Sequence, residues 1–160
     1  MRVGVWIAAF LNAQRYHCIE AEALSVKAVL QYEIPLHGLI RKDPQIIHSN
    51  SFDVSHFEGV MFDRVLIHAV DIHLNAGQSD SLFAKLALKV RPGGQVFISH
   101  NLPKAMRIGH LAFQEKYGFT MTGQFLVPCQ LYDCLEGTCL NKEVCPKGFS
   151  GYFWAFFTKV

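Results

Sequence analysis

The chain has 160 residues, of which 51% are hydrophobic and 18% are charged, and its formal net charge is +2. This length and apolar content allow one folded domain with a core and exclude a disordered chain. The small net charge gives no signal for a nucleic-acid partner, and no apolar run reaches the roughly 20 residues that span a bilayer. We therefore expect a single domain over residues 1–160, with no membrane partner.

The first predicted element is a helix in the sequence MRVGVWIAAFLN, where Val5, Ala8 and Ala9 share one side at helical spacing. The short apolar region of a signal peptide is the alternative interpretation, although Asn12 and the polar residues after it interrupt the run early. The five cysteines, an odd number, favour free thiols in a reducing compartment. We therefore expect a cytoplasmic protein.

Two short strands and a helix come next. Residues 16–19 form a short apolar run that predicts a strand ending at Glu20. Residues 23–31 predict a helix, which Pro35 is expected to end because proline lacks an N–H and crowds the preceding turn. A second strand is predicted over residues 45–48. A polar turn, Asn50-Ser51-Phe52-Asp53, follows it.

The stretch from Phe62 to Ser99 predicts a strand, a helix and a second strand. The apolar run at residues 65–70 suits a buried strand, and Ser79 or Asp80 is expected to cap the helix after it. Such a strand–helix–strand unit implies parallel pairing. The predicted inner face of the helix carries Leu82, Phe83, Leu86 and Val90, and the turn that ends it is Arg91-Pro92-Gly93-Gly94.

The C-terminal third predicts one helix and two strands. Residues 101–116 read as a helix with Ile108, Leu111 and Ala112 on its inner face, ended by Gly118. Residues 119–127 and 152–159 are the predicted strands, the second rich in aromatic side chains that suit a buried pleat.

The segments FDRVLIHAVDIHL, LFAKLALKVRPGG and QVFIS resemble the fourth strand, the following helix and the fifth strand of class I S-adenosylmethionine-dependent methyltransferases. GFTMTGQFLV and GYFWAFFTKV resemble the antiparallel hairpin that closes the sheet of this family. The resemblance implies an α/β, Rossmann-like fold with a mostly parallel sheet, helices on both faces and a C-terminal antiparallel β-hairpin. It covers nearly the whole chain.

The resemblance also implies S-adenosylmethionine as the cofactor. YHCIEAE resembles the second strand of the family, so Glu20 would accept hydrogen bonds from the cofactor's ribose hydroxyls. Asp53 falls where the family places an acid that bonds the adenine amine, with an Asx turn as the structural alternative. Phe52 would pack against adenine or fill the core. The remaining cofactor-binding candidates are Gly4, as the last glycine of the family's Gly-rich loop, and His68 and Ala69 on the fourth strand.

The first strand and most of the Gly-rich loop of the family have no counterpart in this sequence. Residues 3–8 are the alternative first strand, but only residues 9–15 would then connect them to the next strand, and a parallel crossover needs about a dozen residues or more. We expect a missing strand, which would make the chain a fragment, a shortened product or a degenerate relative. Strand edges exposed by its absence would favour pairing with another chain, as in a homo-oligomer.

A base is needed only if the methyl acceptor must lose a proton, and His73 with Asp71 is our prediction for the catalytic pair. His68 and His100 are also candidate bases, with a hydrogen-bonded core histidine as the alternative for His68. The tetrad found in methylases of nucleic-acid bases is absent, since the sequence reads AVDIH there. The acceptor is therefore expected to be a small molecule or a protein.

A cysteine-rich insertion, residues 128–148, is predicted between the last two strands. Its four cysteines could bind zinc or form a disulfide pair. Their spacings are wider than a C-x2-C pair, so we expect free thiols and no metal. The insertion contains Cys129, Cys134, Cys139 and Cys145.

Three functions are compatible with these patterns. The first is a methyltransferase acting on an unidentified acceptor. The second is a catalytically inactive relative that serves as a binding or scaffold subunit, alone or as a dimer, and the missing loop supports it. A nicotinamide-dependent Rossmann enzyme is the third, and the predicted terminal hairpin argues against it.

Overall fold

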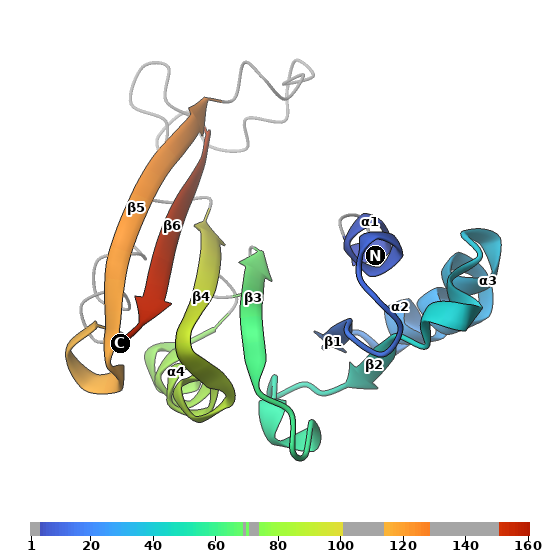
Figure 1. The fold of residues 1–160 in the computed structure, drawn as a ribbon, viewed down its shortest axis with the longest axis horizontal. Coiled ribbons are helices and arrows are strands. Elements are labelled where there is room, and N and C mark those ends of the chain that lie inside the picture. Colours follow the sequence, from blue (N-terminus) through green and yellow to red (C-terminus); the bar gives the residue numbers. More distant parts are fainter. Residues whose placement is uncertain (1–3, 69, 71–73, 101–113, 129–150) are drawn as a thin grey trace. The chain divides into compact units, whose positions relative to one another are not determined.

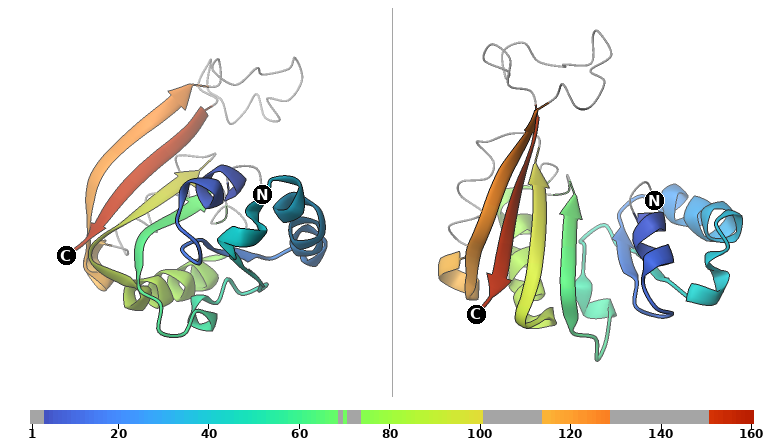
Figure 2. Two further views of the ribbon diagram at one scale, coloured as in Figure 1. Left: turned by 45° about the vertical axis from the view of Figure 1, so that its right-hand side comes forward. Right: turned by 45° about the horizontal axis from the view of Figure 1, so that its top comes forward.

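A computed structural model describes residues 4–68, 70, 74–100, 114–128 and 151–160. These residues form two compact units, Met1–Glu58 and Gly59–Val160, which we describe one at a time (Figures 1 and 2). The single domain expected from the sequence stays a prediction. In the described part of the chain, no helix is long and apolar enough to cross a membrane.

The first unit is built around two short parallel strands. β1 (His17–Glu20) pairs with β2 (Gln45–His48) in a register that sets Glu20 beside His48, so both strands end at the same edge. The β2 bounds match the sequence prediction. The helical segments of this unit are α1 (Gly4–Phe10), α2 (Ala23–Ala28), the π-helical turn Val29–Glu33, α3 (Ile34–Leu36) and the 3-10 turns Leu39–Lys42 and Val54–His56.

The helix that begins at α2 continues past Pro35, where the sequence predicted its end. The backbone N–H of Ile34 donates to the carbonyl of Val29, five residues earlier, so the wider π-turn precedes the proline. Pro35 then lies in the first turn of α3, where its missing N–H costs little. The helix ends instead at Gly38, whose φ of 65° is left-handed.

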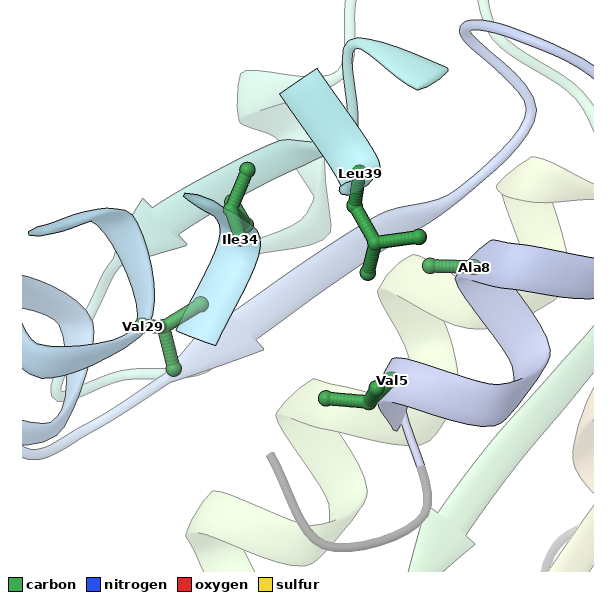
Figure 3. Close-up of a cluster of buried hydrophobic side chains, with 5 residues drawn as sticks. All are labelled: Val5, Ala8, Val29, Ile34 and Leu39. Carbon is green, nitrogen blue, oxygen red and sulfur yellow. The ribbon is translucent and has the colours of Figure 1, made fainter. Parts of the chain in front are cut away.

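Five apolar side chains form the core of the first unit (Figure 3). α1 contributes two of them and packs onto the α2–α3 segment and the 3-10 turn after it. Residues 4–10 are therefore a helix, as the crossover length predicted, and not a first strand. The core residues are Val5, Ala8, Val29, Ile34 and Leu39.

The second unit contains the predicted strand–helix–strand element. β3 (Phe62–His68) pairs in parallel with β4 (Val90–His100), and α4 (Ala76–Lys89) lies along one face of the sheet (Figure 1). Leu82, Phe83 and Leu86 are all 5% exposed or less, which confirms them as the inner face of the helix. Val90 is buried as predicted but is the first residue of β4, and the predicted turn Arg91-Pro92-Gly93-Gly94 also lies within β4.

The cap of α4 differs from the prediction. Asn75, rather than Ser79 or Asp80, is the N-cap: its side chain accepts from the backbone N–H of Gln78, and the Gln78 side chain accepts from the N–H of Asn75. This reciprocal capping box satisfies two backbone donors at once, which a cap at Ser79 does not offer. Ser79 instead lies inside the first turn, where its N–H donates to the carbonyl of Asn75.

The strand order of the second unit is β3-β4-β6-β5, seen side by side in Figure 1. β6 (Gly151–Lys159) runs antiparallel to both β4 and β5 (Phe119–Pro128). The antiparallel β5–β6 pair predicted from the sequence is confirmed, but the mostly parallel sheet is wrong. β6 inserts between β4 and β5, so only the β3–β4 pairing of this sheet is parallel and the sheet is mixed. Helices on both faces stay a prediction, since residues 101–113 lie outside the described part.

Candidate functional site

Glu20 lies at the carboxyl end of β1, where the sequence placed the acidic tip. Its side-chain Oε1 accepts from the backbone N–H of Glu22 at 3.0 Å, and its carbonyl accepts from the N–H of Ser49 at 3.0 Å. The residue is only partly buried. An ionised carboxylate in this position can accept further hydrogen bonds from a ligand.

Ser49 joins the ends of the two strands. It is 8% exposed, its N–H donates to Glu20, and its Oγ accepts from the N–H of Asp53 at 3.2 Å. The N–H of Phe52 donates to the Ser49 carbonyl at 3.2 Å, which closes a tight turn. Glu20 and the Ser49–Asp53 turn are therefore held together at one edge of the β1–β2 pair.

Two residues predicted to bind the cofactor, Phe52 and Asp53, end this turn. Phe52 has a φ of 49°, a left-handed conformation that is strained for a residue with a Cβ and is concentrated at functional sites in proteins. Asp53 Oδ1 accepts from the N–H of Ser55 at 3.0 Å and caps the 3-10 turn Val54–His56. The Asx-turn alternative is therefore present in the structure, and a contact of Asp53 with adenine stays a prediction.

Gly4 is the first residue of α1, as expected for a glycine that leads from a loop into a helix. Residues 1–3 lie outside the described part of the chain, so the structure does not describe the rest of that loop.

Burial shifts the pKa values of three side chains in and next to β1: Tyr16, His17 and Cys18. Burial raises the pKa of the Cys18 thiol and of the Tyr16 phenol, which are hydrogen-bonded to one another, and burial lowers the pKa of His17. His17 also packs edge-on against Phe57, with ring centroids 4.9 Å apart. Burial thus disfavours the charged form of each of these three groups, which suits packing against neighbouring side chains.

In the second unit, His68 ends β3. Its Nδ1 lies 2.6 Å from Ser99 Oγ, and its ring stacks on Trp154 with centroids 5.8 Å apart and an interplanar angle of 11°. His68 is exposed whereas Ser99 is fully buried. His68 is therefore hydrogen-bonded, as the core alternative predicted, but it is not a core residue.

The other predicted residues lie outside the described part of the chain. These are Ala69 of the cofactor set, the catalytic candidates Asp71 and His73, and the cysteines of the insertion. Among the residues that the structure does describe, no group of three or more His, Cys, Asp or Glu side chains could hold a metal ion.

The sequence prediction missed two residues of these sites. Ser49 carried a weak signal, because a serine after a strand can bond the turn that follows. Trp154 carried none, because its place beside Ser99 and His68 depends on the register of β6 against β4.

No protein-family model and no curated protein sequence matches the chain, but solved structures do. A proposed rRNA methylase from Clostridium thermocellum aligns with 98% of this chain and 81% of its own, with a TM-score of 0.66 and 8% identity. A proposed methyltransferase from Thermoplasma acidophilum aligns with 99% of this chain, which spans 63% of that protein, with a TM-score of 0.69 and 13% identity. The glycopeptide N-methyltransferase MtfA, solved with S-adenosylmethionine, aligns with 91% of this chain and 72% of its own at a TM-score of 0.64 and 9% identity. The chain therefore has the fold of the S-adenosylmethionine-dependent methyltransferases.

Proposed function

We propose that this protein binds S-adenosylmethionine and transfers its methyl group to a small-molecule or protein acceptor. The observation that carries the proposal is the link between Glu20 and the Ser49–Asp53 turn. It joins two acidic residues at the carboxyl ends of neighbouring parallel strands, which is where open α/β sheets bind ligands. The five cysteines support a cytoplasmic location for this activity.

The residues of this edge fit the chemistry of the cofactor. The Glu20 carboxylate would accept from ribose hydroxyls, Phe52 would cover the adenine face, and Asp53 would accept from the adenine amine. Gly4 would allow close approach of the backbone to the methionine end. When bound, the cofactor supplies an electrophilic methyl group on a sulfonium sulfur. Asp71 and His73 stay our prediction for the catalytic pair, with Ala69 beside the cofactor.

Glu20→Gln tests this assignment. The amide keeps the size of the side chain but removes its charge and one of its acceptor oxygens, so we expect affinity for S-adenosylmethionine to fall by about 10-fold or more, as for a lost hydrogen bond to a charged group. Calorimetric titration measures the change. Glu115→Gln, which alters an exposed carboxylate of the second unit, is the matched control. Equal losses in both variants would contradict the assignment of Glu20.

A second candidate function is a non-catalytic binding or scaffold subunit that forms a homo-oligomer. Among the described strands, β1 pairs only with β2, and β3 pairs only with β4, so each has an edge that could accept another strand. Several large apolar side chains of the first unit are also exposed, including Trp6 at 71% and Phe10 at 88%. Exposed apolar side chains of this size are typical of interaction surfaces when they are contiguous. Sedimentation of the purified protein over a concentration series tests it: a monomer throughout would argue against self-association.

A further inference from the structure

The hydrogen bonding between β1 and β2 extends past the last pair of their register, which is Glu20 with His48. The backbone N–H of Ser49 donates to the carbonyl of Glu20 at 3.0 Å. One residue further along the chain, the carbonyl oxygen of Ala21 lies 3.0 Å from His48 Nε2. Two successive residues, His48 and Ser49, therefore hold two successive carbonyls at the end of β1.

The contact with Ala21 fixes which nitrogen of the His48 ring carries a hydrogen. A carbonyl oxygen only accepts, so Nε2 is the donor. His48 is exposed, and water competes for the donors of an exposed side chain, so this bond adds little to the stability of the whole fold. Its effect is therefore local and falls on the backbone that follows β1.

The peptide group between Ala21 and Glu22 is held from both sides. Its carbonyl accepts from His48, and its N–H donates to Glu20 Oε1 at 3.0 Å. A peptide group is planar, and in the trans form its C=O and its N–H point to opposite sides. Turning this plane away from His48 would therefore also take its N–H away from the Glu20 carboxylate.

A chain of hydrogen bonds thus runs from His48 through one peptide group to Glu20. Hydrogen bonds in such a chain polarise and strengthen one another. The Glu22 side chain fixes the other end of the loop, because its Oε1 accepts from the N–H of Leu24 at 3.2 Å and caps α2. The backbone after β1 is therefore fixed at Ala21 by β2 and at Glu22 by α2.

This chain leaves the Glu20 carboxylate oriented but not saturated. An ionised carboxylate offers about four lone-pair sites, so the bond from Glu22 leaves others for the donors of a ligand. A side chain that is already ordered does not lose its conformational entropy at the moment of binding. The arrangement is therefore suited to a ligand that presents hydroxyl groups at this edge.

We propose that His48 is a positioning residue for the ribose of the cofactor. It holds the Ala21–Glu22 peptide and thereby keeps the Glu20 carboxylate in one orientation for the ribose hydroxyls. This inference rests on the proposed function and adds a residue of β2 to the group that recognises the cofactor.

Exchange of the Glu22 amide hydrogen with water, measured by NMR, tests the link to the peptide without any cofactor. Methionine and glutamine are similar in length, but only glutamine offers an N–H donor. We expect this hydrogen to exchange about 5-fold faster in His48→Met, as for one lost hydrogen bond, and at the wild-type rate in His48→Gln. His37→Met, at an exposed histidine of the same unit, is the control. Equal exchange in His48→Met and the wild type would overturn the proposal.

A double-mutant cycle with Glu20→Gln tests the link to the ribose. Calorimetric titration with S-adenosylmethionine should show about 5-fold weaker binding in His48→Met and wild-type affinity in His48→Gln. In the Glu20→Gln background, His48→Met should cause no further loss, because His48 acts through the carboxylate that this variant lacks. The same 5-fold loss in that background would show that His48 acts independently of Glu20 and would overturn the proposal.

The two experiments separate this inference from the proposed function. If the wild type binds no S-adenosylmethionine, the proposed function fails and the ribose role of His48 fails with it, while the exchange of the Glu22 hydrogen still shows whether His48 holds the peptide. If the wild type binds S-adenosylmethionine and His48→Met changes neither its affinity nor the exchange rate, the inference alone fails.

Discussion

Gly94, in β4 between the register pairs of Val90 and Gln95, has no room for a side chain. A Cβ there would lie 2.7 Å from Val90 Cγ1, 2.8 Å from the carbonyl oxygen of Arg91 and 3.1 Å from that of Phe62. Two of these atoms are backbone and cannot move without shifting the bulge that separates the Phe62 and Arg64 register pairs. The glycine is therefore required by close approach of the chain.

Gly94→Ala should lower the free energy of unfolding by about 1–3 kcal/mol, the usual cost of overpacking. Urea denaturation followed by circular dichroism measures it. Gly77→Ala is the control, because the nearest atom to its added Cβ is 3.5 Å away and the residue is helical. Equal stability of Gly94→Ala and the wild type would show that the bulge is more adaptable than the structure indicates.

The capping box of α4 also allows a prediction about stability at the residue scale. Asn75→Ala removes the acceptor for the Gln78 N–H and should cost about 1 kcal/mol of stability. Ser79→Ala should cost less, since Ser79 is inside the first turn. The order of the two melting temperatures checks this: a larger loss in Ser79→Ala would favour the cap expected from the sequence.

At the scale of elements, α4 is tied to the helical residues 114–117 by Asp80. Its Oδ1 accepts from Lys116 Nζ at 2.9 Å and from the Tyr117 hydroxyl at 2.8 Å. The hydrogen bond from Lys116, followed by that from Tyr117, holds the pKa of Asp80 below its ordinary value. The same bond to Asp80 raises the pKa of Lys116. These contacts therefore favour the ionised carboxylate in the folded state.

The pH dependence follows from the sign of that shift. A carboxyl with a lowered pKa in the folded state adds stability that is present above its ordinary pKa and is lost as the pH falls through the lowered one. The melting temperature of the wild type should therefore exceed that of Asp80→Asn at pH 7, and the gap should close as the pH falls below about 4. The gap should also shrink in high salt, since the pair is exposed. A gap that persists at pH 2 would show that Asp80 acts by packing.

At the scale of the whole molecule, the sequence predicted those features of the fold that depend on residues close together in the chain. The helical spacing of Leu82, Phe83 and Leu86 indicated their burial, and the short connection after residue 8 indicated that α1 is a helix. The apolar run at residues 16–19 indicated that Glu20 ends a strand, which it does, while its role in cofactor binding stays a prediction. The place of β6 beside β4, which makes the sheet less parallel than expected, was not predicted. It depends on pairs such as Gln95 with Thr158 and His100 with Phe153, which lie 63 and 53 positions apart in sequence. The same long-range register brings Trp154 to Ser99, which no local pattern shows.

The central claim is that this fold binds S-adenosylmethionine, and calorimetric titration of the wild-type protein tests it most directly. S-adenosylmethionine and its demethylated product share the ribose and adenine that Glu20, Phe52 and Asp53 are proposed to contact. We therefore predict that both ligands bind, each with one site per chain and with affinities in the micromolar range typical of enzyme ligands. The contradicting result is absence of binding by either ligand at millimolar concentration.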